Sequence, residues 1–90
     1  MLIRQYNVYG RVQGVGFRYF TWKKAQQLDL KGFVRNLSDG SVSILVQGTQ
    51  EQLAQFRHWL EEGPKTAHVE RVLEQHYDEE RVFTTFEIRY

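Results

Sequence analysis

The chain has 90 residues, a length typical of one domain, so we expect a single domain over residues 1–90. It contains no cysteine, which excludes disulfides and thiolate metal sites, and its formal net charge is only +1. Non-specific nucleic-acid binders usually carry a marked basic excess, so the charge argues against that class. No stretch approaches the ~20 apolar residues of a membrane-spanning helix, and the first residues lack the apolar run of a signal peptide. We therefore expect a cytoplasmic protein.

The first half of the chain predicts a strand, a helix and a hairpin. Residues 2–12 alternate, with Leu2, Tyr6, Val8 and Val12 on one face of a half-buried strand. From Phe17 to Leu28 the apolar residues recur at helical intervals, which indicates an amphipathic helix. Residues 32–48 then read as a hairpin around Asp39-Gly40, a dipeptide that favours tight turns.

The second half predicts a second helix and two extended segments. Thr49 and Gln52 have the spacing of a capping box, and Gly63-Pro64 should end the helix that they begin. Residues 67–75 read as extended with room for a β-bulge, 76–81 as a charged turn, and 83–90 as a last strand. The order β-α-β-β-α-β plus a short extra strand predicts an α+β, ferredoxin-like fold, in which two helices cover one face of an antiparallel sheet.

The stretch "GRVQGVGFR", residues 10–18, lies between the first strand and the first helix. The first N–H groups of a helix lack partners, and glycines let neighbouring N–H groups turn toward one point, so residues 13–18 could cradle an anion. Arg18 would add a guanidinium whose fork matches two phosphate oxygens. From the residues alone, turn glycines and a solvated arginine explain the stretch equally well. It matches neither a Walker loop nor a dinucleotide fingerprint.

Two motifs together resemble a known family. "GRVQGVGFR" matches every fixed position of the acylphosphatase signature, and "GFVRNLSDG", residues 32–40, resembles the second motif of that family. Phe33 stands where many relatives carry tryptophan, which exchanges one buried aromatic for another. The closing "FEIRY" is similar to the usual tail of the family, so the resemblance spans the whole chain.

The resemblance implies an enzyme that hydrolyses the mixed anhydride of a carboxylic acid and phosphate, with no metal, cofactor or covalent intermediate. It implies that Arg18 binds the phosphate and that Asn36 positions the attacking water. We further expect a monomer whose partner is a small acyl phosphate, without nucleic-acid or membrane partners. The implied phosphate cradle is the backbone of Gln13, Gly14, Val15, Gly16, Phe17 and Arg18.

The implied roles are chemically consistent. An asparagine can accept a hydrogen bond from a water through its carbonyl and donate one through its amide, and an acyl phosphate needs no strong base. By residue chemistry alone, Asn36 is also a common strand-end residue, and strand alternation puts Arg35 on the opposite face as a surface charge. His58, His68 and His76 do not have the spacing of metal ligands, so we expect solvated side chains there.

Two alternatives remain beside the enzyme. An RNA-binding module shares the order of strands and helices, and "KGFVRNLS", Lys31 to Ser38, begins like its aromatic motif. The match fails at Arg35, where that motif needs a stacking aromatic ring. The other alternative is a non-catalytic, accessory acylphosphatase-like domain.

Overall fold

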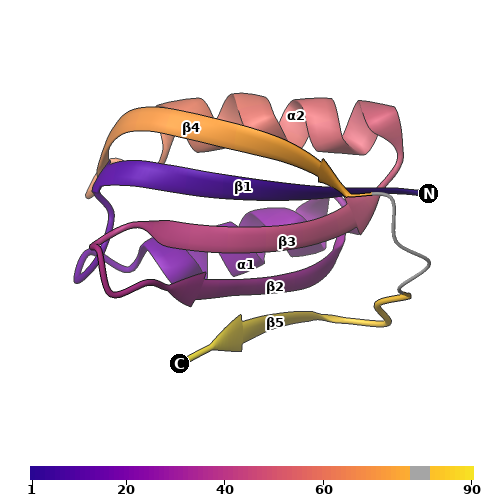
Figure 1. Ribbon diagram of the computed structural model, residues 1–90, viewed down its shortest axis with the longest axis horizontal. Helices are drawn as coiled ribbons and strands as arrows, with labels where there is room; N and C mark the ends of the chain where they lie inside the picture. The colour runs from indigo at the N-terminus through magenta and orange to yellow at the C-terminus, as the bar shows by residue number, and fades with distance from the viewer. Residues whose placement is uncertain (78–81) are drawn as a thin grey trace.

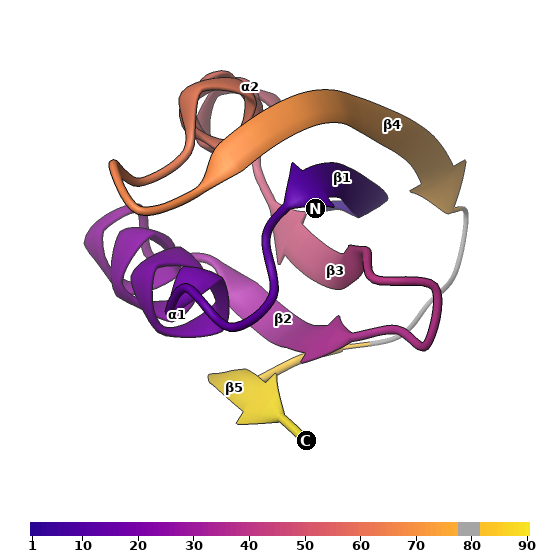
Figure 2. The same ribbon diagram turned by 90° about the vertical axis from the view of Figure 1, so that its left-hand side faces the viewer.

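The computed structural model describes residues 1–77 and 82–90. Its helices and strands form two layers, with both helices on one face of the sheet (Figure 1; Figure 2). Within these described ranges, no helix is long and apolar enough to cross a membrane. The elements are β1 (Leu2–Arg11), α1 (Phe17–Gln27), β2 (Lys31–Asn36), β3 (Val42–Gly48), α2 (Gln50–Glu62), β4 (His68–Tyr77) and β5 (Phe86–Arg89).

The strand order in the sheet is β4-β1-β3-β2-β5. The first four strands pair antiparallel, which confirms the ferredoxin-like prediction. The short extra strand β5 pairs with β2 in parallel, so the complete sheet is mixed. Because β2 and β5 run in the same direction, the C-terminus of the chain lies next to the C-terminal end of β2.

The predicted elements need small corrections. Leu2 is 37% exposed, because it is the first residue of β1 and lies at the end of the sheet. The sequence predicts a charged turn over residues 76–81, but His76 and Tyr77 continue β4 by pairing with β1. Residues 78–81 of the predicted turn lie outside the described residues. The bulge is confirmed, since the β1–β4 register shifts between Tyr9 and Gly10. The last strand is limited to the four residues of β5.

The core lies between the sheet and the helices. Tyr6 and Val8 of β1, together with Val12 directly after it, point into the core, and the apolar stripes of α1 and α2 cover it from the other side. The ring of Tyr6 in β1 packs edge-on against Phe56 in α2, with ring centroids 6.0 Å apart. The fully buried residues with the largest side chains are Tyr6, Phe17, Phe56, Leu30, Ile44, Leu60, Val8, Val12, Val34, Val42, Val46 and Thr21.

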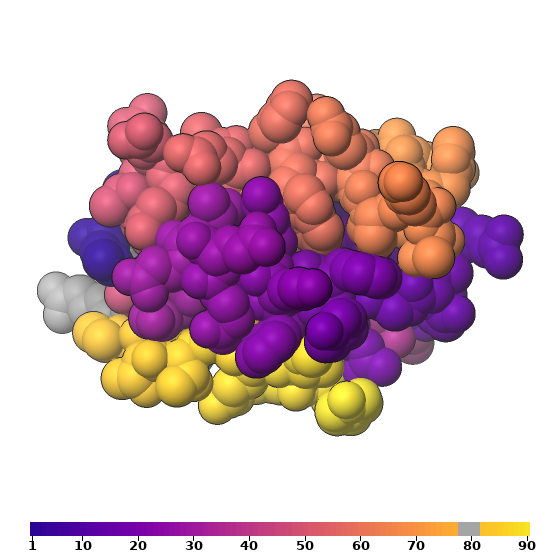
Figure 3. Space-filling model, turned by 180° about the vertical axis from the view of Figure 1, so that it is seen from behind, coloured from indigo at the N-terminus to yellow at the C-terminus, as the bar shows by residue number. Residues whose placement is uncertain are grey.

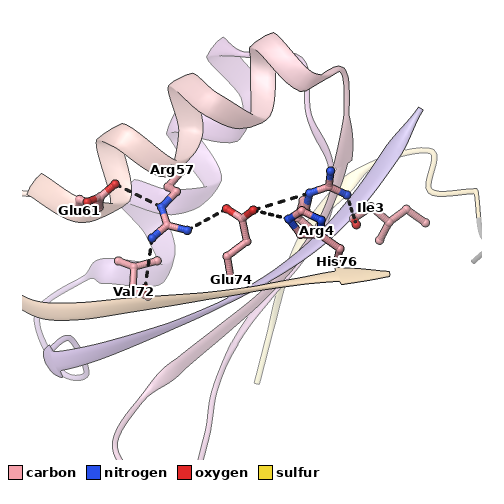
Figure 4. Close-up of polar contacts among 7 residues, drawn as sticks. All are labelled: Ile3, Arg4, Arg57, Glu61, Val72, Glu74 and His76. Carbon is pink, nitrogen blue, oxygen red and sulfur yellow. Dashed lines mark hydrogen bonds and ion pairs between the residues drawn. The ribbon is translucent and has the colours of Figure 1, made fainter. Parts of the chain in front are cut away.

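A polar network joins α2 to the edge of the sheet (Figure 4). Arg57 of α2 donates a hydrogen bond to Glu74 of β4 at 2.9 Å and another to Glu61 at 3.3 Å. Glu74 also contacts His76 at 2.7 Å and Arg4 of β1 at 3.8 Å. The carboxylate of Glu74 therefore links α2 to β1 and β4, at the edge of the sheet opposite β5.

Candidate active site

Residues 12–16 connect β1 to α1 through a loop with two left-handed glycines. Gly14 has a φ of 74° and Gly16 a φ of 78°, a conformation that costs about 1–2 kcal/mol for a residue with a Cβ. A Cβ on Gly14 would meet nothing within 4 Å, so the backbone conformation and not the space requires glycine there. The two glycines turn the chain sharply into the helix.

The N-terminus of α1 has no cap from a side chain. Its N-cap residue is Gly16, which has no side chain to donate or accept, and the first turn holds no acidic residue. The N-terminus of α2 is different, because Thr49 and Gln52 form a complete capping box and Glu51 lies in the first turn. The first N–H groups of α1 are therefore available to an anionic ligand.

Arg18 lies in the first turn of α1, where a cation is disfavoured by the positive end of the helix dipole. Its Nη1 donates a hydrogen bond to the carbonyl oxygen of Arg89 at 2.9 Å, and its guanidinium carbon lies 4.5 Å from the centroid of the Tyr90 ring. One bond to a carbonyl leaves most of the guanidinium N–H groups free to bind an anion. The end of the chain thus orients an arginine beside the uncapped helix start.

Asn36 is the last residue of β2. Its side-chain oxygen Oδ1 is buried and has no hydrogen-bond partner among the described residues. A buried polar atom without a partner costs about 1–3 kcal/mol, so such an atom usually faces a bound water or ligand. Asn36 is therefore suited to hold a water.

Arg18 and Asn36 line the same cavity, which has a volume of about 250 Å³. The start of α1, the end of β2 and the C-terminus meet at this end of the sheet (Figure 2). Seen from behind, the atoms of α1 lie against those of β5 (Figure 3). The lining residues are Val12, Gly14, Gly16, Phe17, Arg18, Tyr19, Asn36, Ile88 and Tyr90.

Two residues of the predicted cradle, Gln13 and Val15, are not among these lining residues. The side-chain amide of Gln13 donates to the carbonyl oxygens of Leu37 and Ser41, at 2.7 and 2.9 Å. The carbonyl oxygen of Val15 accepts a hydrogen bond from Thr66 Oγ1 at 2.8 Å. These contacts fix the loop from both sides, so the two residues shape the cavity without lining it through their side chains.

Sequence reasoning missed four lining residues, Val12, Tyr19, Ile88 and Tyr90, as parts of a site. Parallel pairing sets Ile88 opposite Val34, so the next residues on the same face are Asn36 and Tyr90. The alternation of Phe86, Ile88 and Tyr90 was visible in the sequence, but its partner strand was not.

The remaining candidates lie elsewhere. Arg35 is exposed, as expected for the opposite face of β2. His58, His68 and His76 are exposed and do not line the cavity. In residues 1–77 and 82–90, no group of three or more His, Cys, Asp or Glu side chains could hold a metal ion.

Comparison with known proteins identifies the family. The family model "Acylphosphatase" matches residues 4–88. The acylphosphatase of Pasteurella multocida (strain Pm70) is 58% identical over 90 residues, covering all of both chains. The crystal structure of acylphosphatase from Bacillus subtilis superposes with a TM-score of 0.96 at 36% identity, also over the whole of both chains. A crystal structure of T. kodakarensis HypF matches with a TM-score of 0.87 at 30% identity, covering all of this chain but 12% of that one. The chain therefore belongs to the acylphosphatase family, and it is a hydrolase that acts on acyl phosphates.

Proposed function

We propose that this chain hydrolyses acyl phosphates with the phosphate bound by Arg18 and the backbone N–H groups of residues 13–18, while Asn36 positions the attacking water. The observation that carries this proposal is the shared cavity. It is lined by Arg18, by the uncapped start of α1 and by Asn36, whose buried Oδ1 has no partner among the described residues.

Arg18 and the loop supply the electrostatic part of catalysis. In phosphoryl transfer the transition state spreads negative charge over the equatorial oxygens, and fixed donors around those oxygens lower the barrier. The bond from Arg18 to the Arg89 carbonyl already orients the guanidinium, so little reorganisation is needed when the substrate binds.

Asn36 supplies the orientation of the nucleophile. Its carbonyl can accept a hydrogen bond from the water, and its amide can donate one. The leaving group is a carboxylate, which departs without protonation, so the water needs alignment more than a strong base. We propose that no metal or cofactor takes part, because the guanidinium and the amides supply the positive charge that a metal would otherwise provide.

The proposal includes a monomeric enzyme in the cytoplasm that binds no nucleic acid. The residues assigned to the reaction, Arg18, Asn36 and the loop, line one cavity, so the proposed site needs no residue from a second copy. The formal net charge of +1 supports the absence of a nucleic-acid partner.

The test compares three variants in the hydrolysis of benzoyl phosphate. Arg18→Ala should raise KM and lower kcat together, by a factor of about 10²–10³ in kcat, because the guanidinium contacts both ground and transition states. Asn36→Ala should lower kcat while inhibition by inorganic phosphate is retained. Arg35→Ala, which removes an exposed arginine on the other face of β2, is the control and should behave as wild type. Wild-type turnover in Asn36→Ala would contradict the role of Asn36.

A further inference from the structure

The turn between α2 and β4 contacts the loop before α1. Thr66, which lies in this turn, donates a hydrogen bond from its Oγ1 to the carbonyl oxygen of Val15 at 2.8 Å, across 51 positions of the sequence. Neither Val15 nor Thr66 is among the residues that line the cavity. The contact therefore lies behind the loop, on the side away from the proposed phosphate site.

The backbone that carries Thr66 is itself held by hydrogen bonds on both sides. The N–H of Ala67 donates to the carbonyl oxygen of Pro64 at 3.0 Å, which closes a tight turn. Before the turn, the N–H of Gly63 donates to the carbonyl oxygen of Trp59 at 2.7 Å and so attaches the chain to the end of α2. The side chain of Ala67 packs against the core. The hydroxyl of Thr66 is therefore presented to the loop from a fixed support.

The bond to Val15 also sets the direction of the next N–H group. A peptide unit is planar and trans, so the C=O of Val15 and the N–H of Gly16 point in opposite directions. Gly16 lines the cavity, and its N–H makes no hydrogen bond to another described residue. Holding the carbonyl oxygen behind the loop therefore turns this N–H toward the cavity.

Without the bond, little would fix the orientation of this peptide unit. It is flanked by Gly14 and Gly16, and glycine populates positive and negative φ about equally. The side chain of Val15 packs against the core, which restrains the residue but leaves its carbonyl free to rotate. A rotated peptide unit would direct a carbonyl oxygen, which carries partial negative charge, at the bound phosphate. A donor behind the loop keeps an N–H facing the anion instead.

We propose that Thr66 is a positioning residue for the reaction: its hydroxyl holds the carbonyl of Val15 and so keeps the N–H of Gly16 directed at the phosphate group of the substrate. This inference rests on the proposed function, because it needs the phosphate to bind at the loop before α1. Thr66 touches no part of the substrate and acts only through the peptide unit between Val15 and Gly16.

The experiment measures the inhibition constant of inorganic phosphate and kcat/KM for benzoyl phosphate. Thr66→Val replaces the hydroxyl by a methyl group and should raise the inhibition constant and lower kcat/KM, each roughly threefold to tenfold, the factor expected when one hydrogen bond is lost. Thr66→Ala also removes the hydroxyl and should give the same result, whereas Thr66→Ser keeps it and should retain both wild-type values. Thr84→Val is the control, because Thr84 is exposed and its side chain makes no hydrogen bond to a described residue.

The amide resonance of Gly16 gives a readout that a change in stability alone would not produce. In isotope-labelled wild type, saturating phosphate should shift the amide proton of Gly16 downfield, because that N–H then donates to an anion. In Thr66→Val, also at saturating phosphate, the shift should be smaller. Thr84→Val should show the wild-type shift.

The outcomes separate this role from the phosphate site itself. A wild-type inhibition constant and a wild-type Gly16 shift in Thr66→Val would overturn the role of Thr66 and leave the proposed function intact. Equal losses in Thr66→Val and Thr66→Ser would also overturn it, because the hydroxyl would then not be the group that acts. If phosphate does not inhibit the wild type, the anchoring site is wrong, and the role of Thr66 is wrong with it.

Discussion

The side-chain amide of Gln13 donates a hydrogen bond to the carbonyl oxygen of Leu37 at 2.7 Å. Gln13 belongs to the loop before α1, and Leu37 directly follows Asn36. A second bond, to the carbonyl of Ser41 at 2.9 Å, closes the turn between β2 and β3 around the same amide. The loop proposed to bind phosphate and the residue proposed to hold water are therefore joined through one side chain.

Gln13→Ala should lower kcat about tenfold, equivalent to ~1.4 kcal/mol in the barrier, because Asn36 and the loop would no longer be held in register. The loss of two hydrogen bonds should also cost about 1–2 kcal/mol of stability. Steady-state kinetics and denaturant unfolding measure the two effects. Gln26→Ala, on the exposed face of α1, is the control and should change neither. A Gln13 variant with normal kcat would show that the bridge has no role in positioning.

Gly14→Ala and Gly40→Ala form a matched pair. Both glycines have positive φ, 74° and 92°, and a Cβ at either would meet nothing within 4 Å. Each substitution should therefore destabilise the fold by a similar amount, about 1–2 kcal/mol. Only Gly14 lines the cavity, so only Gly14→Ala should also raise the inhibition constant for phosphate severalfold. Equal effects on phosphate binding would show that the conformation of Gly14 is not part of the binding site.

Local patterns in the sequence predicted most of the fold. The capping box of Thr49 and Gln52, the turn at Asp39-Gly40 and the helical spacing after Phe17 each depend on residues a few positions apart, and all three are confirmed. The positive φ of Gly40 has the same local origin, since Asp-Gly dipeptides favour such turns. Caps, turns and helical spacing can be predicted from the sequence because the interacting residues lie within the same short stretch.

The missed parts of the site depend on contacts between distant residues. Arg18 and Arg89 are separated by 71 positions and Gln13 and Leu37 by 24, and no periodicity links the members of either pair. Tyr19 resembles any exposed helix residue until β5 is known to lie beside α1. The sequence thus indicated which residues could bind phosphate. The neighbours that orient these residues could not be predicted without knowing the order of the strands in the sheet.

Inorganic phosphate should stabilise the wild type against heat. At about one hundred times its dissociation constant, a ligand that binds only the folded state adds about 2.7 kcal/mol, which should raise Tm by roughly 10 °C or more in a domain of this size. Arg18→Ala should lose most of this shift, and Arg35→Ala should keep it. Thermal unfolding with and without phosphate measures the effect. A full shift in Arg18→Ala would contradict the assignment of the anion site.

Chelation should not affect turnover. If the guanidinium of Arg18 and the backbone amides supply the positive charge, EDTA should leave the hydrolysis of benzoyl phosphate unchanged. The comparison needs enzyme that has been dialysed against EDTA and assayed without added metal. Activity that is lost on dialysis and restored by a divalent cation would require a different mechanism.

The network around Glu74 should make stability depend on acid pH (Figure 4). Burial raises the pKa of Glu74, but the hydrogen bonds and charges of Arg57 and His76 outweigh it, so the folded-state pKa lies below the usual glutamate value. A lowered pKa stabilises the fold above the unfolded value of about 4.3, and this contribution is lost as the pH falls through the folded-state pKa.

Glu74→Gln should therefore cost about 1 kcal/mol at pH 7, where the wild-type carboxylate is charged and contacts Arg4, Arg57 and His76. The difference between wild type and variant should shrink as the pH falls through the folded-state pKa of Glu74, because protonation then removes the same charge from the wild type. Glu62→Gln, whose 71% exposed side chain pairs with His58, should cost little at either pH. Denaturant unfolding at pH 7 and pH 3 measures all three proteins. Glu74 lies in β4, the edge strand opposite β5, so the kcat of Glu74→Gln at neutral pH should equal that of the wild type. A loss of stability in Glu74→Gln that persisted at pH 3 would mean that Glu74 stabilises the fold by packing instead of charge.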